Sequence, residues 1–486
     1  MALWRVLRNS SFMMLAQVIT WLSSMILIAT LGRALGDDGF GDLYLAIAFG
    51  TISYVLVEFG IGPHLEREVA RDHRLAGPYL ANAIIIKVAF SIVAYGLTLL
   101  VVQRLHYSET LQLTIAVYSL SLPFTAVATS LTSVYRATEN VFHAMVGQVI
   151  EKVSTCLLAI TLLWLDFGVV AVAVAYVAGI AGGALWQARF LLPQLHGTLT
   201  VKHQTMRALL RGGRPFVAQG GAVAIYARAD ILILSVLADV AIKGWYGAAY
   251  RLFETLYFLS GIVSMSLFPI LARLSVGPRA EFRRAISTNF NVMLILGVPI
   301  CTGLFVLAEP ILLLVYGQPE FVRATPALRW LAIALFFGYM ESVARGVIIS
   351  TDRERRMVPA AFLGAALNVG LNWLLIPTFQ HVGAAAVTAV TDLLIVCYWL
   401  ALLPRDLLPR DSLAVALKVA TVAGVMAAAL YALRGYHLLV LVPTGGLIYC
   451  VGTMLLRTLP PDDLRAFHRA LATRRQGSGK IEATRA

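Results

Sequence analysis

The segment FMMLAQVITWLSSMILIATL, residues 12–31, is a run of about 20 residues that carries no charge. As an α-helix rising 1.5 Å per residue it is long enough to cross a bilayer hydrocarbon core of roughly 30 Å. Arg5 and Arg8 precede it, but the run is longer than the apolar region of a cleaved signal peptide, and no obvious A-x-A cleavage site accompanies it. We therefore expect it to remain in the protein as the first transmembrane helix.

Similar apolar runs recur along the whole chain. Of the 486 residues, 59% are hydrophobic and 13% are charged, whereas soluble globular chains carry about 25% charged residues. Hydrocarbon offers no water to backbone polar groups, so helices are the expected spanning element. We predict an all-α integral membrane protein with about fourteen transmembrane helices, at Phe12–Leu31, Gly41–Gly60, Ala81–Val102, Leu111–Val134, Ala144–Leu165, Val169–Phe190, Pro215–Leu237, Gly244–Ala272, Asn289–Tyr316, Pro326–Thr351, Val358–Pro377, Ala384–Leu403, Leu413–Leu433 and Leu438–Leu456. Pro123, Pro299 and Pro310 interrupt the fourth and ninth of these helices, which are therefore candidates to bend.

The net charge of +13 has a simple topological explanation. Most of the 39 Lys and Arg residues lie at the N-terminus, in alternate loops and in the C-terminal tail. The opposite loops hold few of them: Arg33, Arg104, Lys243, Arg323 and Arg434. This alternation follows the positive-inside rule, predicts that both termini are cytoplasmic, and needs no nucleic-acid partner.

The first twelve helices resemble one six-helix unit used twice. The string YRATEN at 135–140 resembles ISTDRE at 349–354, each after the fourth helix of its unit. Internal repeats of this kind are typical of transporters. We predict an N-terminal lobe at 1–192, a basic cytoplasmic linker at 193–213, a C-terminal lobe at 214–404, two further helices at 405–457 and a cytoplasmic tail at 458–486.

Ionisable side chains within the predicted helices are the candidate functional residues. A charge at membrane depth costs several kcal/mol, so such residues normally face a bundle interior or an aqueous cavity. The set comprises Lys87, Glu151, Lys152, Arg228, Asp230, Arg251, Glu254, Glu341, Arg345 and Asp392. Glu58 lies near a helix end, from which it could reach water.

Spacing separates charge pairing from functional use. Glu341 and Arg345 are four residues apart and Arg251 and Glu254 three apart, so the members of each pair can meet on one helix face and neutralise each other for insertion. Arg228 and the aspartate two residues later are rotated by about 200° and cannot touch directly. Each of those two side chains needs a partner on another helix or in a cavity, and for Arg228 we favour a cavity that faces substrate. The adjacent residues at 151 and 152 leave both interpretations open.

Several functions are disfavoured by what the sequence lacks. It contains no G-x-x-x-x-G-K-[ST] motif, no HExxH motif and no long soluble segment that could hold a nucleotide. The four cysteines show no CxxC spacing. We therefore expect neither metal, cofactor nor enzymatic activity.

Extended stretches of the chain resemble the polysaccharide and oligosaccharide-lipid flippases of the multidrug/oligosaccharidyl-lipid/polysaccharide exporter superfamily. The resemblance spans about 400 residues and rests on strings in family order: LGRALGDDGFGDLYLAIAF (31–49), FGIGPHLEREVAR (59–71), ARADILIL (227–234), GWYGAAYRLFETLYF (244–258), LFPILARL (267–274), LGVPICTGLFVLAEPILLLVYG (296–317) and LNVGLNWLLIPTFQHVGAAAVTAV (367–390). It implies two six-helix lobes around a cavity, alternating access, a bacterial inner membrane and a polyprenyl-diphosphate-linked oligosaccharide as substrate. Related lipid II flippases have an Arg in an Ala-x-Arg-Leu context, which Arg251 of AAYRL matches.

We accordingly expect a flippase whose substrate-binding residues are Arg228, Arg251, Lys87 and Arg345. Asp230, Glu254, Glu341, Glu151, Lys152 and Asp392 are expected to serve in coupling or charge pairing. The expected partners are membrane lipids, H+ or Na+ as coupling ion, and a polysaccharide polymerase. A cation-coupled multidrug antiporter on the same fold is the alternative, although Lys87, Arg228 and Arg251 suit an anionic cargo better. A membrane-embedded glycosyltransferase or polymerase is less favoured, because the longest loop carries no acidic residue.

Overall fold

The computed structural model describes residues 2–351, 353–404, 406–409 and 412–458, and within them it contains helices and no β-strand. The predicted all-α class is therefore confirmed. The α-helices are α1 (Ala2–Glu58), α2 (Ile61–Arg71), α3 (Ala76–Arg104), α4 (Glu109–Ser119), α5 (Ser121–Ala137), α6 (Phe142–Trp164), α7 (Gly168–Leu191), α8 (His203–Leu237), α9 (Val240–Leu274), α10 (Arg279–Val306), α11 (Ala308–Tyr316), α12 (Thr325–Ser350), α13 (Met357–Leu402), α14 (Ser412–Ala432) and α15 (Leu438–Leu455). Short 3₁₀ segments lie at His73–Leu75, Leu192–Leu195, Pro319–Ala324 and Glu354–Arg356.

Within the described residues, eleven helical segments are long and apolar enough to cross a membrane. Two of them, Leu15–Glu58 and Met357–Leu402, each contain two predicted spans. The backbone breaks between those spans, at Gly36 with φ 69° and at Gln380 with φ 50°. The predicted number of about fourteen spans stays a prediction.

Proline divides two of the predicted helices. Helix α4 ends at Ser119, four residues before Pro123, and α10 ends at Val306, four residues before Pro310. A proline ring clashes with the carbonyl group four residues earlier, which explains both end points. Pro299, by contrast, lies inside α10 without ending it. Predicted helices four and nine are thus each divided near one proline, and a bend in them stays a prediction.

The chain packs as two compact units. Of the described residues, the first unit takes 2–252, 312–327 and 357–391, and the second takes 253–311, 328–351, 353–356, 392–404, 406–409 and 412–458. The predicted lobe and linker boundaries stay predictions, although the second half of the predicted linker is helical because α8 begins at His203. The predicted tail, apart from Thr458, lies outside the described residues.

An apolar core in the first unit is built around the short helix α2. Ile61, Leu65 and Val69 recur every four residues and are all buried, which gives α2 one apolar face. They pack with residues of α3, α5 and α8, among them Tyr135 and Leu209. Residues 61–71 belong to none of the predicted helices. Helix α2 begins three residues after Glu58, and its backbone N–H at Gly62 donates to that glutamate.

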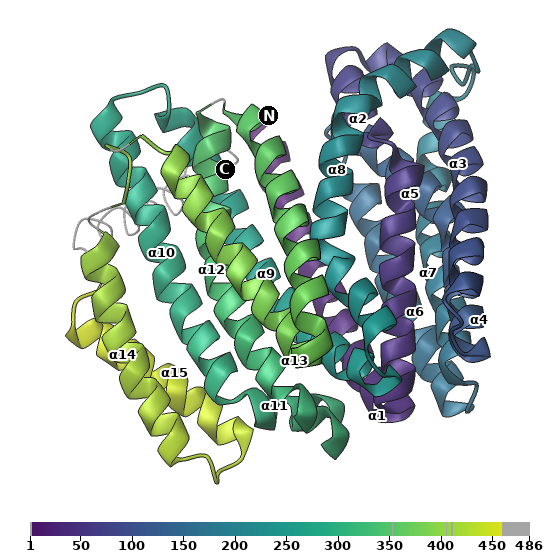
Figure 1. Ribbon diagram of the computed structural model, residues 1–486. Helices are drawn as coiled ribbons and strands as arrows, with labels where there is room; N and C mark the ends of the chain where they lie inside the picture. The colour runs from purple at the N-terminus through teal and green to yellow at the C-terminus, as the bar shows by residue number, and fades with distance from the viewer. Residues whose placement is uncertain (1, 352, 405, 410–411, 459–486) are drawn as a thin grey trace, which may run out of the picture. The chain divides into compact units, whose positions relative to one another are not determined.

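In the second unit, the hairpin of α14 and α15 packs against α10 (Figure 1). Val419, Val422 and Met426 of α14 form a buried cluster with Tyr449 of α15. The Tyr449 hydroxyl donates to the carbonyl oxygen of Ile295 at 2.9 Å. This bond satisfies a phenol that would otherwise be costly among apolar helices.

Candidate functional site

Helix α8 holds the two charged residues that were expected to find separate partners. Arg228 donates from Nη1 to the hydroxyl of Tyr44 at 3.0 Å. Its guanidinium also lies 5.7 Å from the ring centroid of Tyr44 and 5.9 Å from that of Tyr250. Asp230 is buried and accepts a hydrogen bond from the hydroxyl of Tyr246. Each side chain therefore has a partner on another helix, as its spacing predicted.

A second tyrosine brings three of the predicted residues together in the same unit. The buried hydroxyl of Tyr118, on α4, interacts electrostatically with Arg251, Arg228 and Glu151. Its ring packs against that of Tyr176 on α7, with centroids 5.7 Å apart. Two guanidinium groups and one carboxylate thus act on one hydroxyl in the first unit.

Beside that cluster, the adjacent residues of α6 form their own ion pair. Lys152 donates from Nζ to Oε1 of Glu151 at 2.8 Å. The lysine side chain is 44% exposed, whereas the glutamate is mostly covered. The pair is therefore open at its lysine end, and Glu151 is the member that reaches the cluster.

Lys87 on α3 is enclosed in a different network. Its Nζ lies 2.5 Å from Oε2 of Glu58, and its side chain is 0% exposed. The hydroxyl of Tyr54 donates to the same oxygen at 2.7 Å, and the backbone N–H of Gly62 donates to Oε1 at 2.6 Å. Glu58 therefore compensates the lysine and caps the start of α2 at once. This closed geometry favours a structural role for Lys87, and its predicted contact with substrate stays a prediction.

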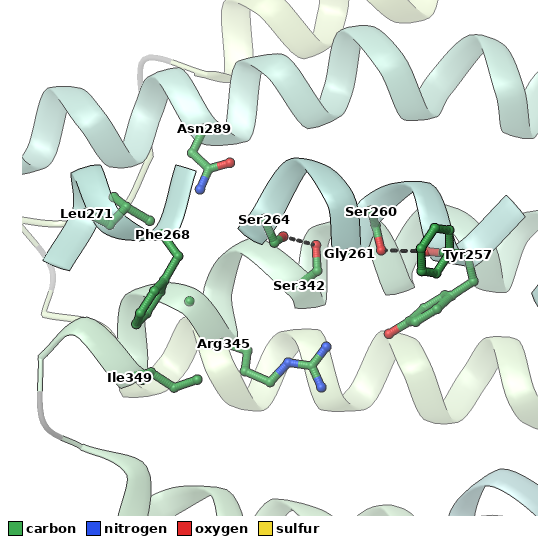
Figure 2. Close-up of a pocket in the computed structure, with 12 residues that line it drawn as sticks. Tyr257, Ser260, Gly261, Ser264, Phe268, Leu271, Asn289, Ser342, Arg345 and Ile349 are labelled. Atoms are coloured by element: carbon green, nitrogen blue, oxygen red, sulfur yellow. Dashed lines mark hydrogen bonds between the residues drawn. The ribbon is translucent and has the colours of Figure 1, made fainter. Parts of the chain in front are cut away.

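A cavity of about 470 Å³ lies in the second unit, between α9, α10 and α12. Arg345 lines it, and its Nη1 lies 3.9 Å from Oε1 of Glu341, so the predicted pairing along α12 is confirmed. Figure 2 shows the Arg345 guanidinium pointing toward the hydroxyl of Tyr257. Three predicted charged residues interact electrostatically with that hydroxyl: Glu341, Arg345 and Asp392. Asp392 is buried, and Glu254 lies half-buried on α9.

The cavity lining mixes polar and apolar side chains. Ser264 donates to the hydroxyl of Ser342 at 3.1 Å. Asn289, which is 3% exposed, has a side-chain oxygen with no hydrogen-bond partner among the described residues, and it lies beside Phe268 and Leu271 (Figure 2). A cation, hydroxyls and one amide among apolar groups suit an anionic amphiphile.

The tyrosines that organise both charged clusters were not predicted from the sequence. Tyr44, Tyr118, Tyr246 and Tyr257 all lie in apolar runs, where a phenolic hydroxyl needs a polar partner. That requirement was a usable signal, but the partners belong to distant segments. Also missed was Asp42, an acidic residue within the second predicted helix. Among the described residues, no group of three or more His, Cys, Asp or Glu is placed to hold a metal ion.

Long apolar helices with buried, partly compensated charges, and a polar cavity among them, define a multi-pass membrane protein of the transporter class. Residues 6–275 match the family described as "Polysaccharide biosynthesis protein", and residues 200–456 match the family described as "Lipid II flippase MurJ". Each match covers more than half of the chain. The chain therefore belongs to the flippases of the multidrug/oligosaccharidyl-lipid/polysaccharide exporter superfamily, as its resemblance indicated.

Individual relatives agree with this assignment. The chain is 22% identical over 373 residues to the probable low-salt glycan biosynthesis flippase Agl15 of Haloferax volcanii, covering 75% of this chain and 76% of that protein. It is 29% identical over 179 residues to the probable lipid II flippase MurJ of Haemophilus influenzae, covering 33% and 35%.

Solved structures share the fold. The lipid II flippase MurJ in an inward closed conformation superposes with a TM-score of 0.73 at 16% identity, covering 92% of this chain and 98% of that one. An inward-facing multidrug resistance MATE family transporter gives a TM-score of 0.64 at 15% identity, covering 79% and 92%. Both likenesses concern the fold alone.

Proposed function

We propose that the protein moves a polyprenyl-diphosphate-linked oligosaccharide from the inner to the outer leaflet of a bacterial cytoplasmic membrane for polysaccharide biosynthesis. The observation that carries this proposal is that Arg228 and Arg251 both interact electrostatically with the Tyr118 hydroxyl within apolar helices. Planar guanidinium groups recognise phosphate through paired N–H donors. Flippases of glycan lipids among the relatives support the same substrate class.

The local geometry suits a headgroup site. Tyr44 and Tyr250 hold the Arg228 guanidinium from two helices, which reduces the entropy lost when it binds phosphate. Arginines held near the midplane need not cross the membrane with the cargo. An anion then moves outward down an inside-negative potential with a gain of about 2.3 kcal/mol per charge per 100 mV. No bond is made or broken, so we propose a transporter that works by alternating access.

The cavity in the second unit is the proposed second contact for the cargo. Arg345 lies 38% exposed along its wall, and the apolar side chains of the lining suit hydrocarbon. We assign Arg345 to the substrate-binding set, and Glu341 and Asp392 to its charge compensation.

A cation-coupled drug antiporter is the second candidate, because Asp230 and Asp392 are buried carboxylates and the fold is shared with a drug transporter. Under that mechanism the carboxylates would bind the cargo or its coupling ion. Under ours, H+ or Na+ drives the conformational cycle, a polysaccharide polymerase takes over the exported lipid, and both termini are cytoplasmic.

The test is a transport assay with the purified full chain in proteoliposomes. A fluorescent undecaprenyl-diphosphate-linked oligosaccharide should become accessible to a glycosidase on the opposite face, whereas a cationic dye should not be extruded under an H+ or Na+ gradient. Vesicles with empty membranes are the control. Dye extrusion without lipid translocation would favour the drug antiporter over the flippase.

A further inference from the structure

A small polar cavity of about 310 Å³ lies at one end of the first unit, apart from the charged clusters above. The connection between α3 and α4 lines it with His106, Tyr107 and Ser108. The end of α8 contributes Ser235, and the connection to α9 contributes Asp239. The predicted topology places these connections on the outward side, because they are the loops that contain Arg104 and Lys243.

Lys243, in the first turn of α9, is the cation of this cavity. It lines the cavity although only 2% of its surface is exposed. Its nearest carboxylate oxygen, Oδ1 of Asp42, lies 4.0 Å away, at the limit of an ion pair. That oxygen has no hydrogen-bond partner among the described residues, and none is described for the lysine Nζ. A buried ammonium compensated at this distance still has donors to offer, and an anion in the cavity would satisfy them.

The position of the lysine follows from a close crossing of two helices. A Cβ on Gly41 of α1 would meet the backbone of Gly244 on α9 at 2.7 Å, so the two helices touch at these glycines. Asp42 follows Gly41 and Lys243 precedes Gly244, so the crossing places these two charged residues opposite each other. It also fixes their separation, because neither backbone can approach further.

The remaining lining suits a sugar ring. The Lys243 Nζ lies 5.6 Å from the ring centroid of Tyr107, and the Tyr107 hydroxyl shares a hydrogen bond of 2.7 Å with the hydroxyl of Ser235. Gln112 holds the Tyr107 backbone by donating to its carbonyl oxygen at 2.7 Å. An aromatic face, hydroxyl groups and one carboxylate match the apolar face and hydroxyls of a sugar. The volume is at the lower end of ligand pockets, roughly 300–1,000 Å³, and excludes a long oligosaccharide.

We propose that this cavity binds a single acidic sugar unit of the exported glycan, with the carboxylate or phosphate substituent of that sugar on Lys243. The proposal rests on the flippase function and adds to it a preference for glycans with an anionic unit. The ring of the sugar lies against Tyr107. The anion completes the coordination that Asp42 leaves open.

The test uses saturation-transfer NMR on the purified full chain in nanodiscs, with glucuronate, glucose and inorganic phosphate as probes. Glucuronate should give transfer signals and glucose should not. Lys243→Gln combined with Asp42→Asn, which keeps the local charge balanced, should weaken glucuronate by about tenfold or more. Arg104→Gln, which removes an exposed cation near the cavity that does not line it, is the control that should keep binding. Competition by inorganic phosphate would identify a phosphate substituent as the group recognised, and its absence a carboxylate.

Equal signals from glucose and glucuronate, or signals that survive in the double variant, would overturn the proposal. So would the absence of glucuronate binding to the wild-type chain. Lipid translocation in proteoliposomes separates the two proposals: translocation without glucuronate binding removes this site alone, and glucuronate binding without translocation removes the flippase function alone.

Discussion

Lys87 in the first unit and Arg345 in the second are both cations in apolar helices, and each has a glutamate partner. The two ion pairs differ in their burial and in the distance between their charged atoms. Lys87 is fully buried 2.5 Å from Glu58, whose oxygens are also bonded to Tyr54 and Gly62. Arg345 is 38% exposed and 3.9 Å from Glu341, beside a cavity. A compensated charge can thus either hold two helices together or be available to cargo. The exposure of the cation and its distance from the glutamate distinguish the two roles.

The largest effect is expected from removing the lysine of the buried Lys87–Glu58 ion pair. Lys87→Met leaves Glu58, whose side chain is 23% exposed, without its cation, which should destabilise the protein by about 3–5 kcal/mol. Membrane protein level and melting temperature in detergent measure this loss. The double variant with Glu58→Gln should recover much of the level. Normal level and melting temperature with lost export in Lys87→Met would instead make Lys87 a substrate residue.

Removing the Glu341–Arg345 ion pair should lower transport with little loss of stability. Arg345→Gln with Glu341→Gln removes a long ion pair whose arginine is 38% exposed, so the cost in stability should stay below about 1 kcal/mol. Transport should still fall severalfold, because the cavity loses its cation. Protein level and export measured in the same cells distinguish the two effects. Wild-type protein level together with wild-type export in the double variant would remove Arg345 from the proposed substrate site.

Asp230 tests the comparison against the antiporter mechanism. Asp230→Asn keeps an acceptor for the Tyr246 hydroxyl, so we expect a stability loss of about 1–2 kcal/mol and largely preserved lipid export. Thermal unfolding and export report the two quantities. Complete loss of transport at normal protein level would point to a coupling carboxylate instead.

The smallest effect is expected at Lys152. Its side chain is 44% exposed, and an exposed ion pair contributes about 0–1 kcal/mol. Lys152→Gln should therefore leave protein level and export within experimental error of wild type. A strong export defect would show that the lysine, and not Glu151 alone, belongs to the Tyr118 cluster.

Features set by local chemistry could be predicted from the sequence. The apolar runs predicted the helical class, Pro123 and Pro310 marked where helices divide, and the spacing of Glu341 and Arg345 predicted their contact. Helix α2 was missed, although the buried positions 61, 65 and 69 repeat every four residues. That run is too short and too polar to resemble a spanning segment.

Contacts between distant segments could not be predicted. Nothing local indicates that Lys87 bonds to Glu58, 29 positions earlier, instead of facing substrate. The spacing of Arg228 and Asp230 required partners on other helices but could not identify Tyr44 and Tyr246. Such pairings depend on which helices become neighbours in the folded bundle, and a single sequence carries no local signal for that.

The central claim is that Arg228 and Arg251 bind the diphosphate of the cargo. The most direct measurement is polysaccharide export, with quantified membrane protein, in cells that carry Arg228→Gln and Arg251→Gln together. We expect a stably inserted protein, no export and undecaprenyl-linked intermediate accumulating inside, with Lys at either position restoring only part of the activity because it lacks the guanidinium fork. Wild-type export by the stably inserted double Gln variant would contradict the account.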